Sequence, residues 1–390
     1  MAGPGDANVE PSAADRDLRD GIRKFVQRHV VPVADRLDRE DLFPVEVFRK
    51  LGEDGYLGLT LPEEHGGLGL GYRAQATVLE EIARASPALA LSVGAHSNLC
   101  ADNLARNGSA ALRKEFLPAL ASGAEVGALA LTEPDFGSDA LGLRTRAVRK
   151  GRRFLLNGTK QFITNGPVAR TILVYARTDP GAGHRGITAF LVRSDQAGFS
   201  VSRKLDKMGM RGSPTGELAF KEVEVDEDRI VGAENEGVAV VMSGLNVERA
   251  VLAAIPVGIM AECLDRSLAY ARRREQFGRK IGAFQLIQEK LANMYFDLES
   301  SRRLTEAALD SVQADKRAMR QSAAALTVAS ERSTRVALDA IQIYGGYGYM
   351  RDEPLERLAR DAKLLEIGAG TSEIRRLLVA RELLGPGFDA

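Results

Sequence analysis

One segment of the sequence places a carboxylate where it could act as a general base. The run Val240–Met260, VVMSGLNVERAVLAAIPVGIM, is apolar on nearly every helical face, and its main interruptions are Asn246, Glu248 and Arg249. The residues three and four positions from Glu248 on a helix are Gly244, Leu245, Val251 and Leu252. None of them is cationic, so no neighbour on the same helix can pair with the carboxylate. Burying an unpaired carboxylate is costly and raises its pKa, which favours a general base; the alternative is a salt bridge to a basic residue elsewhere in the fold.

A second segment, LLEIGAGTSEIRRL at Leu364–Leu377, has the features of a ligand-binding loop that leads into a helix. Gly368 and Gly370 let a ligand approach the backbone, and Thr371 can cap the helix that follows. The N–H groups at the start of a helix are a natural anion and ligand site. Ala369 offers only a methyl group, so acid–base chemistry at this loop needs a side chain from another segment.

The composition excludes several classes of function. Lys+Arg and Asp+Glu balance at 53 each, so the chain lacks the basic field of nucleic-acid-binding proteins. Its two cysteines and four histidines have no metal-ligand spacing, so we expect no metal site. The first residues, MAGPGDANVEPSAADRD, lack an apolar signal core, and the longest apolar run, Ala250–Ala261, is too short to cross a bilayer. We therefore expect a cytoplasmic protein without nucleic-acid or membrane partners.

The sequence pattern changes twice along the chain and predicts an α+β fold. Residues 16–122 contain amphipathic helical stretches, after a leader at 1–15 that we expect to be disordered. The run GGLGLG at 66–71 follows LPEEH rather than a strand, which favours a loop over a dinucleotide site. Residues 123–234 contain short β-rich runs and two Asn-Gly turn signals, typical of antiparallel strands. Residues 235–390 return to long amphipathic stretches and predict a four-helix bundle.

Four motifs occur along the chain in a fixed order. They are ALTEPDFGSDA (Ala130–Ala140), RRREQFG (Arg272–Gly278), QIYGGYGYMRDEPLERLARD (Gln342–Asp361) and AGTSEIRR (Ala369–Arg376). Together with the helix–β–helix order, they resemble the acyl-CoA dehydrogenase family, and most of all its isovaleryl-CoA dehydrogenase type. The resemblance covers essentially the whole chain beyond the leader. Phe136 departs from the pattern, because the family normally has a small residue there, and its ring could crowd the flavin loop.

The resemblance implies FAD as the cofactor and assigns residues to it. The residues implied to line the isoalloxazine are Leu131, Thr132, Gly137 and Ser138, and those implied to cover the flavin near N5 are Phe162 and Thr164. Those implied to reach the FAD of a neighbouring subunit are Arg274, Phe277, Gln285, Gln342, Gly345 and Gly346. Thr371 and Glu373 are implied to hold the adenine side. Arginine contacts with a pyrophosphate and close approach at glycines suit these roles; the alternative for Arg274 is a solvated helix face.

The resemblance also indicates which residue acts as the general base. Most members of the family carry the catalytic glutamate at the position of Ala369, whereas the isovaleryl branch carries it on an earlier helix, at the position of Glu248. This implies that Glu248 removes the α-proton of an acyl thioester while the β-hydrogen leaves as hydride to flavin N5. The backbone N–H of Ala369 is then implied to hold the thioester oxygen and to stabilise the enolate charge.

The implied substrate is a short-to-medium or branched-chain acyl-CoA. The residues implied to contact it are Ser138, Leu91, Ala239, Asn246, Arg249, Leu252 and Gly368. Ala239 and Asn246 replace a tyrosine and an aspartate of the isovaleryl type, which leaves the chain length open.

Two alternative functions remain open. One alternative is a dehydrogenase of acyl or prolyl groups tethered to a carrier protein in biosynthesis. The other belongs to a different class and is a base-independent flavin monooxygenase or a non-catalytic protein on the same fold. The implied electron acceptor is electron-transfer flavoprotein, and we expect a homo-oligomer, with a tetramer as the usual state of the family.

Overall fold

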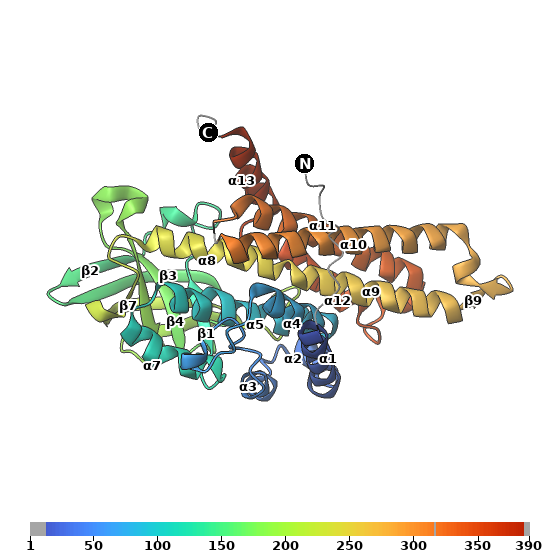
Figure 1. The fold of residues 1–390 in the computed structure, drawn as a ribbon, viewed down its shortest axis with the longest axis horizontal. Coiled ribbons are helices and arrows are strands. Elements are labelled where there is room, and N and C mark those ends of the chain that lie inside the picture. The colour runs from blue at the N-terminus through green and yellow to red at the C-terminus, as the bar shows by residue number, and fades with distance from the viewer. Residues whose placement is uncertain (1–12, 316, 386–390) are drawn as a thin grey trace.

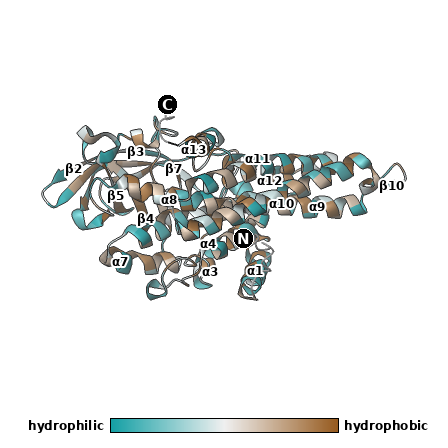
Figure 2. Cartoon of the chain, turned by 45° about the horizontal axis from the view of Figure 1, so that its top comes forward, coloured by the Kyte–Doolittle hydropathy of each residue, from teal (hydrophilic) through white to brown (hydrophobic). Residues whose placement is uncertain are grey.

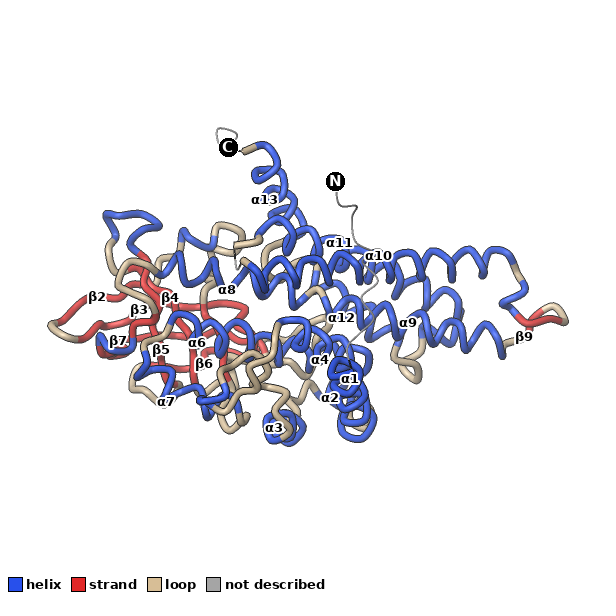
Figure 3. The backbone as a smooth tube through the Cα atoms, in the orientation of Figure 1, coloured by secondary structure: helices blue, strands red, loops and turns tan. Residues whose placement is uncertain are grey.

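The computed structural model describes residues 13–315 and 317–385. The molecule is elongated, with a β-sheet at one end and a long helical bundle extending away from it (Figure 1). The N-terminal helices pack along one side, beneath the sheet and the first half of the bundle (Figure 3).

The N-terminal part is helical, as predicted. Its elements are α1 (Ala13–Phe25), η1 (Val26–Val30), α2 (Ala34–Glu40), α3 (Val45–Glu53), α4 (Tyr72–Ala85), α5 (Pro87–Gly94), η3 (Ala95–Asp102), α6 (Asn103–Asn107) and α7 (Ala110–Ala121). The chain turns between α4 and α5 because Pro87 forces Ser86 into an extended conformation, and the Ser86 hydroxyl then caps α5. The loop predicted for residues 66–71 is confirmed. The predicted leader is wrong at residues 13–15, which belong to α1, and its remainder lies outside the described residues.

The middle part forms an eight-stranded sheet with the order β6-β7-β3-β2-β4-β5-β8, and β1 joins it on β4. The strands are β1 (Gly127–Ala130), β2 (Arg146–Lys150), β3 (Arg153–Thr164), β4 (Thr171–Arg177), β5 (Ile187–Arg193), β6 (Phe199–Lys204), β7 (Thr215–Asp226) and β8 (Ile230–Val231). The sheet is mostly antiparallel, as predicted, but β1 and β2 both meet β4 in parallel. The β2–β3 hairpin separates β1 from β4 in sequence, so the chain has the length that a parallel return requires.

One of the two predicted Asn-Gly turns is wrong. Asn157–Gly158 lies inside β3, at a bulge where the register against β7 shifts. A Cβ at Gly158 would lie 2.4 Å from Thr145 Oγ1, so the close approach of the segment just before β2 requires glycine there. The second pair, Asn165–Gly166, does form a turn after β3, with Asn165 in the left-handed region at φ +63°.

The C-terminal part is the helical bundle. Its elements are α8 (Gly237–Leu252), α9 (Ala254–Arg273), β9 (Glu275–Gln276), β10 (Arg279–Lys280), α10 (Gln285–Ala314), α11 (Met319–Tyr344), η8 (Gly345–Tyr349), α12 (Leu355–Leu365) and α13 (Ser372–Leu384). Hydrophobic and hydrophilic residues alternate along the bundle helices, as amphipathic packing requires (Figure 2). Helix α13 projects away from the bundle axis (Figure 1).

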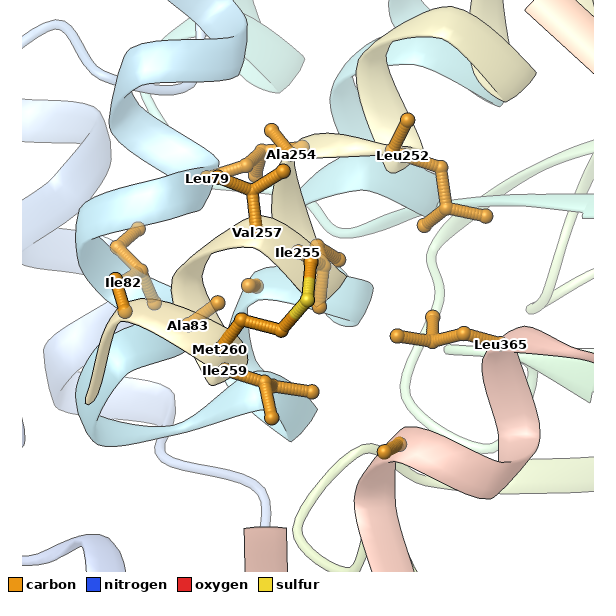
Figure 4. Packing of buried hydrophobic residues seen from close by; sticks show 14 of the residues in the cluster. Leu79, Ile82, Ala83, Leu252, Ala254, Ile255, Val257, Ile259, Met260 and Leu365 are labelled. Atoms are coloured by element: carbon orange, nitrogen blue, oxygen red, sulfur yellow. The ribbon is translucent and has the colours of Figure 1, made fainter. Parts of the chain in front are cut away.

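Helices α8 and α9 form one apolar stretch through the centre of the fold. By length and composition, the span Gly237–Arg273 is long and apolar enough to cross a membrane. The apolar run Ala250–Ala261, considered in the sequence analysis, is only a part of this span. However, 72% of its most apolar window is buried inside the protein, as in a core helix. Figure 4 shows Leu79 and Ile82 of α4 beside Val257 and Met260 of α9, in the main hydrophobic cluster.

Candidate active site

Glu248 lies on α8 and is almost completely buried, with 3% of its surface exposed. Its Oε2 accepts no hydrogen bond from any described residue, and no described cation pairs with it. Burial raises the pKa of Glu248 to about 8, and the nearby charge of Asp102 adds to the rise. The structure therefore confirms the predicted burial and raised pKa, and it contradicts the alternative of a salt bridge.

A glycine on α5 faces this carboxyl group. A Cβ at Gly94 would lie 3.9 Å from Glu248 Oε1, so a larger side chain there would fill the space in front of the carboxyl group. Leu91 lies one turn earlier on α5, and Leu252 lies one turn after Glu248 on α8; both are buried in the main hydrophobic cluster. Ala369 packs against the same cluster. Leu91, Leu252 and Ala369, which the sequence analysis selected from three separate segments, thus belong to or pack against one cluster.

The backbone at Ala369 is held in an unusual conformation. Its φ is +55°, in the left-handed region that a residue with a Cβ rarely adopts, which costs about 1 kcal/mol or more. The Ala369 N–H donates to no other described residue, so it is available to a ligand. Gly370 follows at φ +91°, and the Thr371 hydroxyl accepts a hydrogen bond from Ile374 N at 3.3 Å, which confirms the predicted helix cap.

Arg249 ties this loop to α8. Its Nε donates to the Ala369 carbonyl oxygen at 3.0 Å, and its Nη1 donates to Asn246 Oδ1 at 3.3 Å. The guanidinium group is buried, and burial lowers its pKa to about 10, so it remains a cation at neutral pH. Arg249 therefore holds the Ala369–Gly370 peptide, which directly follows the peptide that carries the Ala369 N–H.

Two other residues predicted to contact the substrate, Ala239 and Ser138, are exposed. Ala239 is exposed in the first turn of α8, nine residues before Glu248, which is about 13 Å along a helix. Ser138 is exposed in the loop after β1, and Gly368 is partly buried beside Ala369. Ala239 and Glu248 therefore cannot contact the same atoms of one substrate.

A buried ion pair anchors the loop after β1, and the sequence analysis missed it. Lys160 is fully buried on β3, and its Nζ donates to the Leu131 carbonyl oxygen and to Glu133 Oε1, both at 2.9 Å. Glu133 also accepts backbone N–H bonds from Arg144 and Thr145 at 2.6 and 2.8 Å. Three chain segments therefore meet at one carboxylate. The sequence around Lys160, GTKQF, gave no clear signal of a buried ion pair.

The predicted flavin-side residues lie around this anchored loop. Gln161 N donates to the Thr132 carbonyl oxygen at 2.8 Å, which joins the loop to the end of β3. A Cβ at Gly137 would meet nothing within 4 Å, so its backbone is open to a ligand. Phe162 has a φ of +59° and is 63% exposed, while Thr164 ends β3 and is partly buried.

The comparisons with known proteins agree on one family. Family models match the acyl-CoA dehydrogenase N-terminal domain at residues 12–124, the middle domain at 128–223 and the C-terminal domain at 235–384. The chain is 50% identical to an isovaleryl-CoA dehydrogenase of Arabidopsis thaliana, over 94% of this chain and 90% of that protein. The chain belongs to the acyl-CoA dehydrogenase family. The predicted family and fold class are thereby confirmed.

Two solved structures show how closely this acyl-CoA dehydrogenase keeps the family fold. Butyryl-CoA dehydrogenase from Megasphaera elsdenii has a TM-score of 0.95 at 34% identity, covering 97% of this chain and all of the other. The prolyl acyl carrier protein oxidase AnaB has a TM-score of 0.93 at 32% identity, covering 96% of this chain and 98% of the other. The first acts on a CoA thioester and the second on a carrier-bound group, so the fold alone does not select between these substrates.

Acyl-CoA dehydrogenases are FAD-dependent flavoproteins, and the residues in this chain fit that cofactor. The open backbone at Gly137, the exposed ring of Phe162 and the hydroxyl of Thr164 together offer an aromatic face and polar groups to a planar ring. Phe136, which departs from the family pattern, does not fill this region. Its ring lies against Gly142 and beneath the Arg144 guanidinium, within its own loop.

A second group of predicted cofactor residues lies far from this loop in the same chain. The β9–β10 hairpin is at the end of the bundle opposite the sheet (Figure 1). Arg274 stacks over Tyr347 beside it, and Phe277 is 92% exposed. The other members of the group are Gln285, Gln342, Gly345 and Gly346, all exposed. Their role toward a neighbouring subunit stays a prediction. Thr371 and Glu373 instead begin α13, beside Ala369, and their contact with the adenine side also stays a prediction.

Proposed function

We propose that Glu248 is the general base of an acyl thioester α,β-dehydrogenation. The observation that carries this proposal is a buried carboxyl group without an ion pair, on the helix that Arg249 joins to the Ala369 loop. A raised pKa suits a base that must take a proton from a weakly acidic carbon. Bound FAD supplies the acceptor for the β-hydride.

Other residues of the chain stabilise the developing charge, position the donor group and bind the acyl chain. The free N–H of Ala369 can donate to the thioester oxygen, where negative charge develops as the α-proton leaves. Arg249 positions that N–H through the Ala369 carbonyl oxygen. The apolar cluster that includes Leu91 and Leu252 receives the acyl chain. A buried carboxyl group placed as a base argues against a base-independent monooxygenase and against a non-catalytic protein. A colourless purified protein would support the non-catalytic alternative.

We further propose that the substrate is a short-to-medium or branched-chain acyl-CoA. Half of the residues are identical to those of the Arabidopsis isovaleryl-CoA dehydrogenase, and the apolar lining at Leu91 and Leu252 suits an aliphatic chain. The likeness to AnaB supports a carrier-bound acyl or prolyl group as the second candidate.

A substrate panel separates these two candidates. The holoenzyme is mixed without an electron acceptor with isovaleryl-, butyryl- and octanoyl-CoA, and with isovaleryl and prolyl groups on a carrier protein. Loss of flavin absorbance reports dehydrogenation. We expect at least one CoA thioester to bleach the flavin at least about tenfold faster than every carrier-bound group. Faster bleaching by a carrier-bound group would reverse the assignment.

We also propose that the chain works as a homo-oligomer, with a tetramer as the expected state. The exposed aromatic and apolar residues Phe277, Tyr347, Tyr349 and Met350 gather near the β9–β10 hairpin and support an interface there. Sedimentation of the holoenzyme measures the state, and Phe277→Ser should weaken both assembly and FAD retention. A monomer that retains FAD would contradict the proposal.

Electron-transfer flavoprotein is the proposed electron acceptor. A cytoplasmic location remains a prediction that cell fractionation tests.

A further inference from the structure

Gln75 of α4 and Asn98 of η3 are buried amide side chains on two segments of the chain that contact each other. The Tyr72 hydroxyl of α4 donates to Asp102 of η3 at 3.3 Å, and Leu79 of α4 lies beside Gly94 of α5. These two contacts show that the helices run antiparallel. Gln75 lies between Tyr72 and Leu79, and Asn98 lies midway between Gly94 and Asp102, so the two amides occupy the same level.

The polar atoms of these amides have no protein partners. Gln75 and Asn98 are both 0% exposed, and neither the oxygen nor the nitrogen of either amide bonds to a described residue. The same is true of Glu248 Oε2 at one end of this row and of Arg106 Nη2 at the other. Leaving a buried polar atom without a hydrogen bond is costly, so six such atoms together point to bound water.

The row connects the proposed base to a second carboxylate. Glu248 Oε1 lies beside Gly94, and the charge of Asp102 is near enough to raise the pKa of Glu248. Asp102 is buried, accepts from the Tyr72 hydroxyl, and pairs with Arg106 Nε at 2.8 Å. The Arg106 side chain is 19% exposed and so reaches the surface. Segment η3 is a π-helix, a geometry frequent at functional sites.

We propose that Gln75 and Asn98 hold a buried chain of water that carries the proton from Glu248 to Asp102. The inference rests on the proposed role of Glu248 as the base. After taking the α-proton, Glu248 is a neutral acid enclosed by the apolar cluster. Its O–H bond breaks, the proton passes along hydrogen-bonded water to the Asp102 carboxylate, and water at the Arg106 edge then takes it to solvent. No electrons are transferred in this step. Burial raises the pKa of the Tyr72 hydroxyl, so it remains protonated and donates to Asp102.

The test measures proton exchange separately from oxidation. The holoenzyme is incubated in D2O with an acyl-CoA analogue that has sulfur at the β position, which can lose its α-proton but not a hydride. NMR follows replacement of the α-hydrogen by deuterium. In Gln75→Leu/Asn98→Leu, we expect exchange to slow by at least about tenfold more than flavin reduction by an oxidisable thioester. Asp102→Asn should shift the ratio of the two rates in the same direction and provides a second, milder variant.

Ser267→Ala is the matched control, because the Ser267 hydroxyl is also buried without a described partner but lies on α9. It should leave both rates unchanged. Equal slowing of exchange and reduction, in both the double variant and Asp102→Asn, would show a structural role and overturn the water path. Full flavin reduction in Glu248→Gln would instead overturn the proposed base itself, so the two failures are distinguishable.

Discussion

Glu248→Gln should abolish dehydrogenation while the protein still binds FAD. Glutamine keeps the size and burial of the side chain but cannot accept the α-proton, and a positioned general base contributes about 10²–10⁴-fold to such a step. The measurement is the rate of flavin bleaching after rapid mixing with the best thioester of the panel. The absorbance of the bound flavin before mixing reports cofactor retention.

The same substitution should stabilise the fold at alkaline pH. The pKa of Glu248 is about 8 in the folded protein, against 4.5 for the free side chain. Between these values the folded state holds a proton that the unfolded state has lost, so the free energy of unfolding falls as pH rises through this window. Below pH 4.5 both states are protonated and the effect vanishes. Glutamine does not titrate, so its advantage should grow from pH 5 to pH 8, to an order of a few kcal/mol.

Asp361→Asn is the matched control for the loss of dehydrogenation. Asp361 is also a buried carboxyl group whose pKa burial raises to about 7, but it accepts a hydrogen bond from Met210 N outside the candidate site. It should retain dehydrogenation. Undiminished bleaching in Glu248→Gln would refute the assignment of the base. Equal loss of bleaching in both variants would show that general destabilisation, rather than removal of the base, explains the result.

Lys160→Met should have the largest effect on stability. Burial lowers the pKa of Lys160 to about 8, with Glu133 opposing the shift. Burial also opposes ionisation of Glu133, but Lys160 and the two backbone donors outweigh it and lower its pKa. Removing the lysine leaves a buried charge without its cation, which costs about 3–5 kcal/mol. Because the pair anchors the loop that carries Gly137, the variant should also lose FAD.

The denaturation midpoint and the ratio of flavin to protein absorbance measure these two effects. Lys160→Met/Glu133→Gln removes both charges and should recover part of the lost stability. Arg153→Met, on the same strand, breaks ion pairs of a side chain that is 57% exposed and should change stability by no more than about 1 kcal/mol. Similar destabilisation by Lys160→Met and Arg153→Met would show that burial does not set the cost of losing this ion pair.

The sequence alone was enough to predict the features that depend on residues close together along the chain. The change from helical to β and back to helical periodicity is a property of neighbouring residues, and it correctly predicted the order of the three parts. The isolation of Glu248 in an apolar helix is equally local, so its burial and raised pKa followed from the residues beside it. The loop of Gly368–Thr371 was recognisable because capping and glycine backbone freedom are local as well. The roles of these residues in catalysis remain predictions.

Only the tertiary structure decided which distant segments meet. The parallel pairing of β1 with β4, the bulge at Asn157–Gly158 and the ion pair between Lys160 and Glu133 each depend on contacts between segments apart in the chain. The same holds for Gln75 and Asn98, since helix periodicity fixes the face of each amide but not the helix opposite. Local sequence constrains backbone conformation, whereas the burial of a polar group and the identity of its partner are settled only when the whole chain packs.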